Sequence, residues 1–209
     1  MAERLQYELH VFTLEKLESI VDRAISFFLG TPLCRFPPPR FVGCGVYALY
    51  YVGHYALYER LGAANRAACV HPIYVGKAVP AGRRKGRSVA SQAAVLHGRL
   101  MEHARNIAQG ADLGTSDFHC RFMILQGQLT DLIVPAESEL IRRSAPLWNS
   151  VIDGFGNHDP GSGRYNQAPS EWDVLHPGRT WVQRLTGQAP PVAKVEQKVR
   201  DWGAQLPLL

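Results

Sequence analysis

Glu137 is the residue whose chemistry fits its place in the sequence least well. It stands three and four positions before Leu140 and Ile141, so in a helix its carboxylate lies on the apolar face. A carboxylate on a buried stripe must be paired, bind a metal ion or be neutral. The alternative is an ordinary glutamate at the start of a helix, stabilised there by the helix dipole and only partly buried.

Arg99 and His103 form a second candidate for chemistry. They stand four positions apart in a stretch with helical periodicity, so they share one face of that helix. Such a pair can touch a phosphate, with arginine as a fixed cation and histidine as a proton acceptor or donor. The alternative is an exposed pair on an amphipathic helix.

Two tyrosines and a lysine belong to two short predicted strands. Tyr47 lies in the run 46–52, Tyr74 lies in 73–75, and Lys77 follows Gly76 where the second run ends. Tyrosines in strands are usually packing residues, whereas a lysine at a strand end can reach a phosphate. The sequence has no GxxxxGK[ST] pattern, so a nucleotide-binding loop and a nucleotide cofactor are not expected.

Composition limits the classes of protein to consider. The chain has 209 residues, 46% of them apolar, and an excess of 23 − 18 = +5 positive charges with a pI near 9.2. An uneven distribution of this charge suits a polyanion such as nucleic acid. The four cysteines include no CxxC pair, so neither a disulfide framework nor a thiolate zinc site is expected. We see no export signal or membrane span, and expect a soluble, cytoplasmic protein.

The elements expected around these residues alternate between strands and helices. A helix is predicted between a Thr13 cap and Gly30, and another over 88–109 with Ser88 as its cap. The run 117–125 alternates as a half-buried strand, and a helix begins near Pro135. We therefore predict an α/β (α+β) fold with a short, mainly antiparallel sheet flanked by helices.

Three regions are predicted along the chain: an N-terminal helical extension over 1–40, a core over 41–152 and a loop-rich elaboration over 153–209. The core carries an inserted helical excursion at about 54–70. The elaboration is rich in Gly, Pro, Asn and His, and it ends in a short helix. A long segment with little periodicity is usually functional or disordered, and its interleaved aromatic residues argue against disorder.

Taken in order, these motifs resemble the GIY-YIG nuclease family. GVY at 45–47 and YVG at 74–76 stand for the two elements that give the family its name. RLMEH at 99–103, ESELI at 137–141 and PLWN at 146–149 match the later motifs. A second YVG at 51–53 follows Tyr47 too closely to form a separate antiparallel strand, so Tyr74 is taken as the second tyrosine. The C-terminal elaboration resembles the type II restriction endonuclease branch.

The resemblance implies Mg²⁺-dependent hydrolysis of phosphodiester bonds in double-stranded DNA, with Mn²⁺ able to substitute. Glu137 would hold the metal and Arg99 would balance charge on the phosphate. Tyr47, Tyr74 and His103 are each candidates for the general base, and Lys77 would be the cation that lowers the pKa of Tyr47. Asn149 would hold Tyr74 or the backbone. The implied catalytic residues are Tyr47, Tyr74, Lys77, Arg99, His103, Glu137 and Asn149.

DNA contacts are expected from two other groups of residues. Phosphate contacts are predicted for the basic run Arg83, Arg84, Lys85 and Arg87. Base reading is predicted for Asn157, His158, Arg164, Gln167 and Arg179 in the loop-rich region. Because arginine reads guanine best, a G·C-rich target is favoured, and the restriction branch implies a homodimer cutting a palindrome to leave 5′-phosphate and 3′-hydroxyl ends. The alternatives are a repair or homing nuclease of the same family, or a noncatalytic DNA-binding module.

Overall fold

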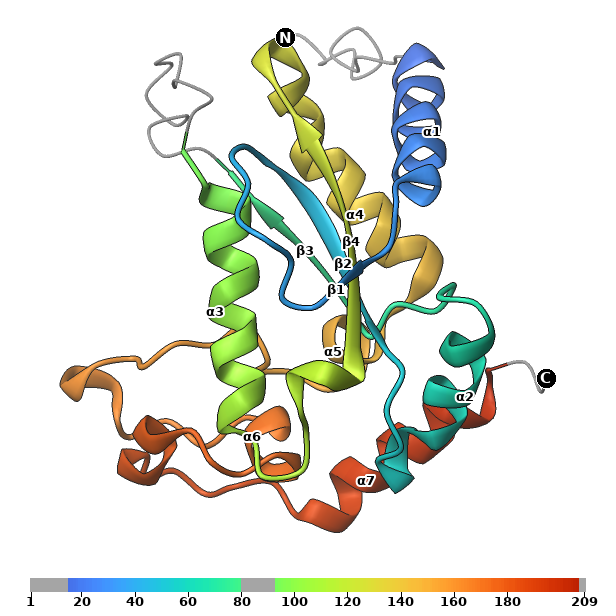
Figure 1. The fold of residues 1–209 in the computed structure, drawn as a ribbon. Coiled ribbons are helices and arrows are strands. Elements are labelled where there is room, and N and C mark those ends of the chain that lie inside the picture. The colour runs from blue at the N-terminus through green and yellow to red at the C-terminus, as the bar shows by residue number, and fades with distance from the viewer. Residues whose placement is uncertain (1–14, 80–92, 207–209) are drawn as a thin grey trace, which may run out of the picture.

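The computed structural model describes residues 15–79 and 93–206, with side chains from residue 18 onward (Figure 1). Its helices and strands, in chain order, are α1 (Glu15–Gly30), β1 (Cys34–Arg35), β2 (Cys44–Tyr51), α2 (Glu59–Ala67), β3 (Tyr74–Ala78), α3 (Val95–Gln109), β4 (Phe118–Leu125), α4 (Ile133–Ser144), α5 (Leu147–Ser150), α6 (Glu171–Leu175) and α7 (Val192–Ala204). Short 3-10 turns include η2 (Ala56–Tyr58), η4 (Thr115–Asp117), η5 (Gly127–Leu132), η6 (Ser162–Arg164) and η7 (Thr180–Arg184).

The sheet in this part of the chain has the strand order β1-β4-β2-β3, and each neighbouring pair is antiparallel. β2 is the central strand, with β4 on one side and β3 on the other, so β3 is an edge strand. The predicted α/β class with a short antiparallel sheet is confirmed. The helical excursion expected at 54–70 is also present, as η2 and α2.

Helices cover both faces of this sheet. Tyr47, Leu49 and Tyr51 of β2 point to the face covered by α3, whereas Val46, Ala48 and Tyr50 point to the face covered by α1 and α4. All eight residues of β2 are buried for this reason. Alternating side chains of a central strand thus supply two separate apolar clusters, one on each face.

Two predicted details differ from the structure. β4 was expected to be half-buried, with one side facing solvent, but Met123 and Leu125 are buried against α1 and α4 while Ile124 is partly exposed. The helix expected to begin at Ser88 begins at Val95. The expected caps Thr13 and Ser88 lie outside the described residues.

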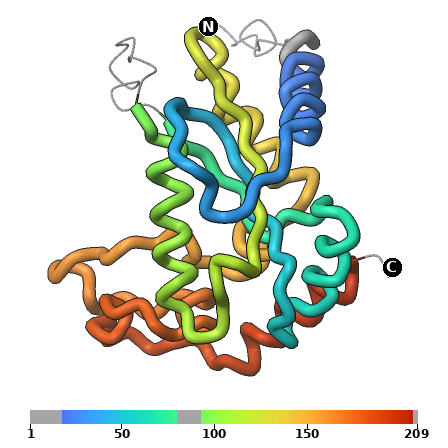
Figure 2. Tube along the Cα trace, in the orientation of Figure 1, coloured from blue at the N-terminus to red at the C-terminus, as the bar shows by residue number. Residues whose placement is uncertain are grey.

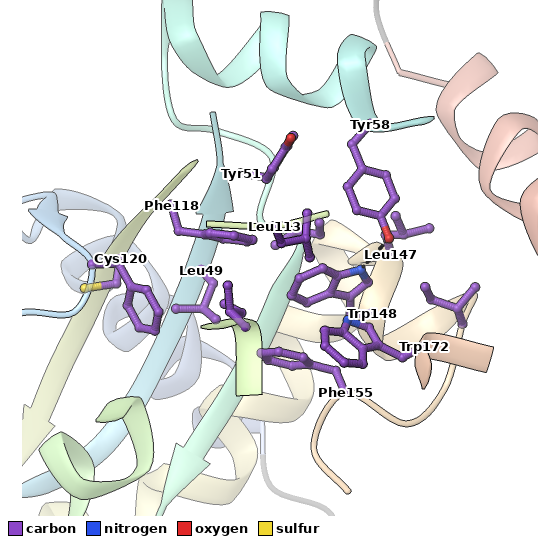
Figure 3. Close-up of a cluster of buried hydrophobic side chains, with 14 of the residues drawn as sticks. Leu49, Tyr51, Tyr58, Leu113, Phe118, Cys120, Leu147, Trp148, Phe155 and Trp172 are labelled. Atoms are coloured by element: carbon purple, nitrogen blue, oxygen red, sulfur yellow. Dashed lines mark hydrogen bonds between the residues drawn. The ribbon is translucent and has the colours of Figure 1, made fainter. Parts of the chain in front are cut away.

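The C-terminal region shares a core with the sheet. Figure 3 shows Trp148, Phe155 and Trp172 packed beside Leu49 and Phe118. The tube in Figure 2 shows the chain after residue 150 running beneath the end of α3 and then back towards α2. Residues 153–206 are therefore anchored to the same apolar cluster that carries one face of the sheet.

Tyr58 and His176 join the inserted excursion to this region. The Tyr58 hydroxyl lies 2.6 Å from His176 Nε2, and it also accepts a hydrogen bond from Trp148 Nε1 at 3.2 Å. Burial lowers the pKa of His176 to about 3. The imidazole is therefore neutral, and its Nε2 accepts the tyrosine proton.

This buried histidine predicts sensitivity to acid. Its folded pKa of about 3 lies below the ordinary value of 6.5, so between these pH values the unfolded chain binds a proton that the folded protein does not. We expect the free energy of unfolding to fall by about 1.4 kcal/mol for each pH unit below 6.5 through this group. His176→Gln should reduce that slope, measured by urea unfolding from pH 7 to pH 5. The exposed His54→Gln is the matched control, and an unchanged slope in His176→Gln would contradict the assignment.

Candidate active site

Five elements bring the predicted catalytic residues together at the edge strand β3. β2 carries Tyr47, and β3 itself carries Tyr74 and Lys77. α3 packs on one face of β3 and α4 on the other, while α5 contacts the same strand. Residues from the two helices therefore reach the strand from opposite sides of the sheet.

Two glycines make this arrangement fit. Gly76 is paired with Tyr47 in the antiparallel register, and a Cβ at Gly76 would stand 2.4 Å from the Tyr47 hydroxyl oxygen. A Cβ at Gly45 would stand 1.9 Å from the carbonyl oxygen of Met123. The glycines of GVY and YVG thus leave room for a neighbouring strand and for the tyrosine side chain.

Tyr47 and His103 form the centre of the site. The Tyr47 hydroxyl lies 2.5 Å from His103 Nε2, and both side chains are buried. Tyr74 meets the His103 ring edge-on at a centroid distance of 5.1 Å. Phe155, from the C-terminal region, stacks on the same imidazole, with ring centroids 4.6 Å apart and ring planes inclined by 17°.

The protonation states of this pair follow from burial. Burial, and then the neighbouring Tyr74, raise the pKa of Tyr47 well above its usual value, and the Arg99 guanidinium only partly opposes this. Burial and the charges of Arg99 and Arg179 hold the pKa of His103 well below its usual value. At neutral pH a protonated phenol therefore donates to a neutral imidazole, which can accept that proton.

Lys77 does not occupy the position predicted for it. It pairs with Val46 in register and points to the α4 face, where its ammonium forms an ion pair with Glu137. Tyr47 points to the α3 face, because side chains alternate along a strand. The expectation that Lys77 is the cation lowering the pKa of Tyr47 is wrong, and Arg99 stands in that place.

Glu137 lies in the second turn of α4, with its side chain 13% exposed. It is close enough to Tyr47 and Tyr74 for its charge to raise the pKa of both phenols. The carboxylate is thus partly buried, ion-paired and within electrostatic range of both tyrosines. The sequence predicted only the helical face of Glu137; its partial burial and its ion pair are seen in the structure.

Asn149 fixes the edge strand. Its Oδ1 accepts a hydrogen bond from the Val75 amide at 2.7 Å, and its Nδ2 donates to the Val75 carbonyl at 2.9 Å. Of the two partners expected for this side chain, Tyr74 or the backbone, the structure has the backbone. Both polar groups of Val75 on the open edge are satisfied, which sets the position of Tyr74 and Gly76 beside it.

Arg99 faces the tyrosines from α3. It forms an ion pair with Glu102 at 2.7 Å and a hydrogen bond with His158 Nε2 at 2.9 Å, and its side chain is 26% exposed. The guanidinium therefore combines a fixed position with access to solvent, as a phosphate-binding group requires.

The residues predicted to contact DNA fall into three groups. Arg83, Arg84, Lys85 and Arg87 lie outside the described residues. A polar hollow in the C-terminal region is lined by Asn157, His158, Arg164 and Gln167, which brings together four of the five side chains predicted to read bases.

Arg179 is the exception. Its side chain is 0% exposed, and it donates to the carbonyl oxygens of Gly154 and Phe155 at 3.0 and 2.6 Å. It also pairs with buried Asp173 at 3.3 Å and stacks over Trp172. A buried guanidinium with these partners cannot reach a base edge, so the predicted role of Arg179 in reading DNA is wrong. It holds the backbone of Gly154 and Phe155, and Phe155 stacks on His103.

Sequence reasoning missed two residues of the site, Phe155 and Glu102. Phe155 lies between two glycines, and nothing local marks it as the partner of a histidine 52 positions earlier. Glu102 lies inside RLMEH, three positions after Arg99, and that spacing alone could have indicated an ion pair.

The described acidic, histidine and cysteine side chains limit how this site could hold a metal ion. Within residues 15–79 and 93–206, no group of three or more His, Cys, Asp or Glu side chains could hold one. Mg²⁺ often uses one or two protein carboxylates and takes its other ligands from water and substrate phosphate. Glu137, partly buried and ion-paired with Lys77, fits this mode of binding.

No helix of the described residues is long and apolar enough to cross a membrane. A family model described as the Eco29kI GIY-YIG domain matches residues 39–202 of the chain. None of the curated proteins compared matches the chain.

Proposed function

The chain belongs to the Eco29kI GIY-YIG family of nucleases, and from this membership we propose that it is a type II restriction endonuclease that hydrolyses double-stranded DNA with Mg²⁺. The observation that carries the proposal is the buried Tyr47–His103 hydrogen bond beside the solvent-accessible Arg99. Proton transfer and phosphate binding are thus available side by side, which a noncatalytic DNA-binding module does not need.

Tyr47 and His103 act together as the general base. An attacking water gives its proton to the Tyr47 oxygen while the phenol proton passes to His103 Nε2. The water oxygen bonds to phosphorus, the bond from phosphorus to the 3′ oxygen breaks, and the leaving 3′ oxygen takes up a proton from solvent water. The products carry 5′-phosphate and 3′-hydroxyl ends. This path needs no free phenolate, which the raised pKa of Tyr47 makes scarce.

The remaining residues bind and orient the phosphate. Arg99 balances the charge that develops on its oxygens, and Tyr74 orients the water or phosphate from the strand fixed by Asn149. Glu137 would hold Mg²⁺, with Mn²⁺ able to substitute. The chemistry supplied by the ion is stabilisation of negative charge on the leaving 3′ oxygen.

Recognition of the target uses two surfaces. The basic run 83–87 binds DNA phosphates. Bases are read from the hollow in the C-terminal region by Asn157, His158, Arg164 and Gln167. The target is a G·C-rich palindrome, and the enzyme acts on it as a homodimer, because a two-fold protein matches a two-fold site.

Arg164 is expected to contribute to sequence preference. It is exposed at the rim of the hollow, and its Nε donates to the Pro160 carbonyl at 3.1 Å. Arg164→Gln should lower discrimination against a wrong base pair by about 1–3 kcal/mol while changing the salt dependence of binding little. Cleavage rates on the cognate site and on sites with one base pair changed measure this. Unchanged discrimination would remove Arg164 from base reading.

Cleavage of plasmid DNA tests the function itself. The purified protein is incubated with plasmid and Mg²⁺, and the ends of the products are sequenced. Discrete fragments with a common palindromic terminus are expected, and EDTA should prevent their formation. A smear would point to a nonspecific or repair nuclease, and intact plasmid with bound protein would point to a DNA-binding module.

A further inference from the structure

Glu102 is a carboxylate in the catalytic centre to which the proposed reaction assigns no role. It lies one turn beyond Arg99 on α3, with its side chain 29% exposed. Its Oε2 accepts a hydrogen bond from Arg99 Nη1 at 2.7 Å, and its Oε1 lies 2.6 Å from His158 Nδ1. The two oxygens of one carboxylate thus hold residues from two separate parts of the chain.

Arg99 and His158 also contact each other directly. Arg99 Nη1 lies 2.9 Å from His158 Nε2, and an arginine can only donate. His158 Nε2 is therefore the acceptor nitrogen, and Nδ1 carries the proton that it donates to Glu102. The carboxylate fixes both the tautomer and the direction of the ring.

His158 belongs to a segment that is held on the catalytic centre at several points. Phe155 stacks on His103, and Arg179 binds the carbonyl groups of Gly154 and Phe155. Gly156 lies so close that a Cβ there would stand 3.3 Å from the Tyr74 hydroxyl and 3.5 Å from Arg99 Nη2. The same segment lines the polar hollow, together with Arg164 and Gln167.

We propose that Glu102 is a positioning residue that ties Arg99 to His158, so that contact between DNA and the C-terminal hollow sets the guanidinium at the scissile phosphate. This rests on the proposed nuclease function and deepens it. Because the tie acts on the orientation of Arg99, correct sequence is read out in the cleavage step more than in DNA binding.

The test uses variants that keep the shape of each side chain. Glu102→Gln removes the charge, His158→Gln removes the ring, and a double variant combines them. Glu139→Gln is the matched carboxylate control, because Glu139 holds Arg142 and Arg143 on the surface of α4. His54→Gln is the matched histidine control, because exposed His54 pairs with Glu59.

Two quantities are measured for each variant: the single-turnover cleavage rate at saturating DNA with Mg²⁺, and the Kd for the same DNA without metal. We expect Glu102→Gln and His158→Gln to cut the cognate site about 10- to 100-fold more slowly. The Kd of Glu102→Gln should change less than about 3-fold. The Kd of His158→Gln rises by the loss of its base contact, and saturating DNA keeps this loss out of its cleavage rate. The double variant should be no slower than the slower single variant, and the rate ratio between cognate and one-base-changed sites should fall.

Several results would overturn the inference: a loss seen only in Kd, effects that multiply in the double variant, or an equal loss in Glu139→Gln. If Glu102→Gln fails to fold, the exposed His158→Gln still decides by the same measurements. If the wild-type protein cuts DNA and both single variants cut it as fast as the wild type, the inference is overturned but the proposed function is not. A wild-type protein that cuts no DNA overturns the proposed function and the inference with it.

Discussion

Glu137→Ala is expected to lower the rate of Mg²⁺-dependent DNA cleavage by roughly a thousandfold, equivalent to about 4 kcal/mol of transition-state stabilisation. The variant removes the carboxylate assigned to the metal and leaves the ammonium of Lys77 without its partner. Cleavage of cognate DNA is measured in single turnover over a range of Mg²⁺ concentrations. Excess metal should not restore the rate.

Glu139→Ala is the control for this variant. It removes a glutamate from the same helix, two positions further on, that pairs only with surface arginines in the described structure. Glu137→Gln separates charge from packing, because it keeps the volume of the side chain and should still fail to support cleavage. Near wild-type cleavage by Glu137→Ala would refute the metal assignment.

Tyr47→Phe is expected to slow cleavage by about 10²–10⁴-fold, the usual range for losing a general base. The change removes one oxygen from a buried side chain and leaves His103 Nε2 without its partner at 2.5 Å. DNA binding should change little, since the phenol acts on the attacking water. Single-turnover rates and Kd values, measured side by side, separate the two effects.

Tyr50→Phe is the matched control, because Tyr50 is buried on the same strand but points to the α1 and α4 face. Both variants should be compared for thermal unfolding, so that a folding defect is not taken for a catalytic one. Full cleavage by Tyr47→Phe would assign the base to Tyr74 or to His103 without Tyr47. An equal loss in Tyr50→Phe would point to general damage to the sheet.

The rate of wild-type cleavage should also remain nearly constant between pH 6.5 and 8. A free histidine would change its protonation state near pH 6.5, but burial and neighbouring Arg99 hold the pKa of His103 well below that value. His103 is thus already neutral and able to accept a proton at pH 6.5, and it loses this ability only at lower pH. A half-maximal rate close to pH 6.5 would contradict this assignment.

Local patterns predicted the elements and most of the centre. The period-two and helical patterns gave the strands around Tyr47 and Tyr74 and the helix that carries Arg99 and His103, because these depend on residues close in sequence. The face of Lys77 follows from its odd spacing to Tyr74, because side chains alternate along a strand, so its ammonium points away from the face that carries Tyr74 and Tyr47. The start of α3 at Val95 was missed because Ser88 offered a conventional cap.

The burial of Arg179 could not be obtained in this way. Its partners Gly154 and Phe155 are about 25 residues away in sequence, and Asp173 gives no local sign of being buried. Long-range packing decided the matter, since the stack on Trp172 and the two carbonyl acceptors enclose the guanidinium. The same holds for Phe155, whose contact with His103 exists only in the folded chain.

The position of Phe155 has a consequence for attempts to exchange specificity between relatives. A recognition region that is a separate module can be replaced as a cassette while the catalytic part keeps working. Here the segment after residue 153 supplies Phe155, whose ring stacks on His103. A transplant at that boundary therefore also replaces a side chain that packs against a proposed catalytic residue. A graft that leaves 154–158 and Arg179 in place, and exchanges only 159–170, keeps the contacts that Phe155 makes with His103 and Arg179.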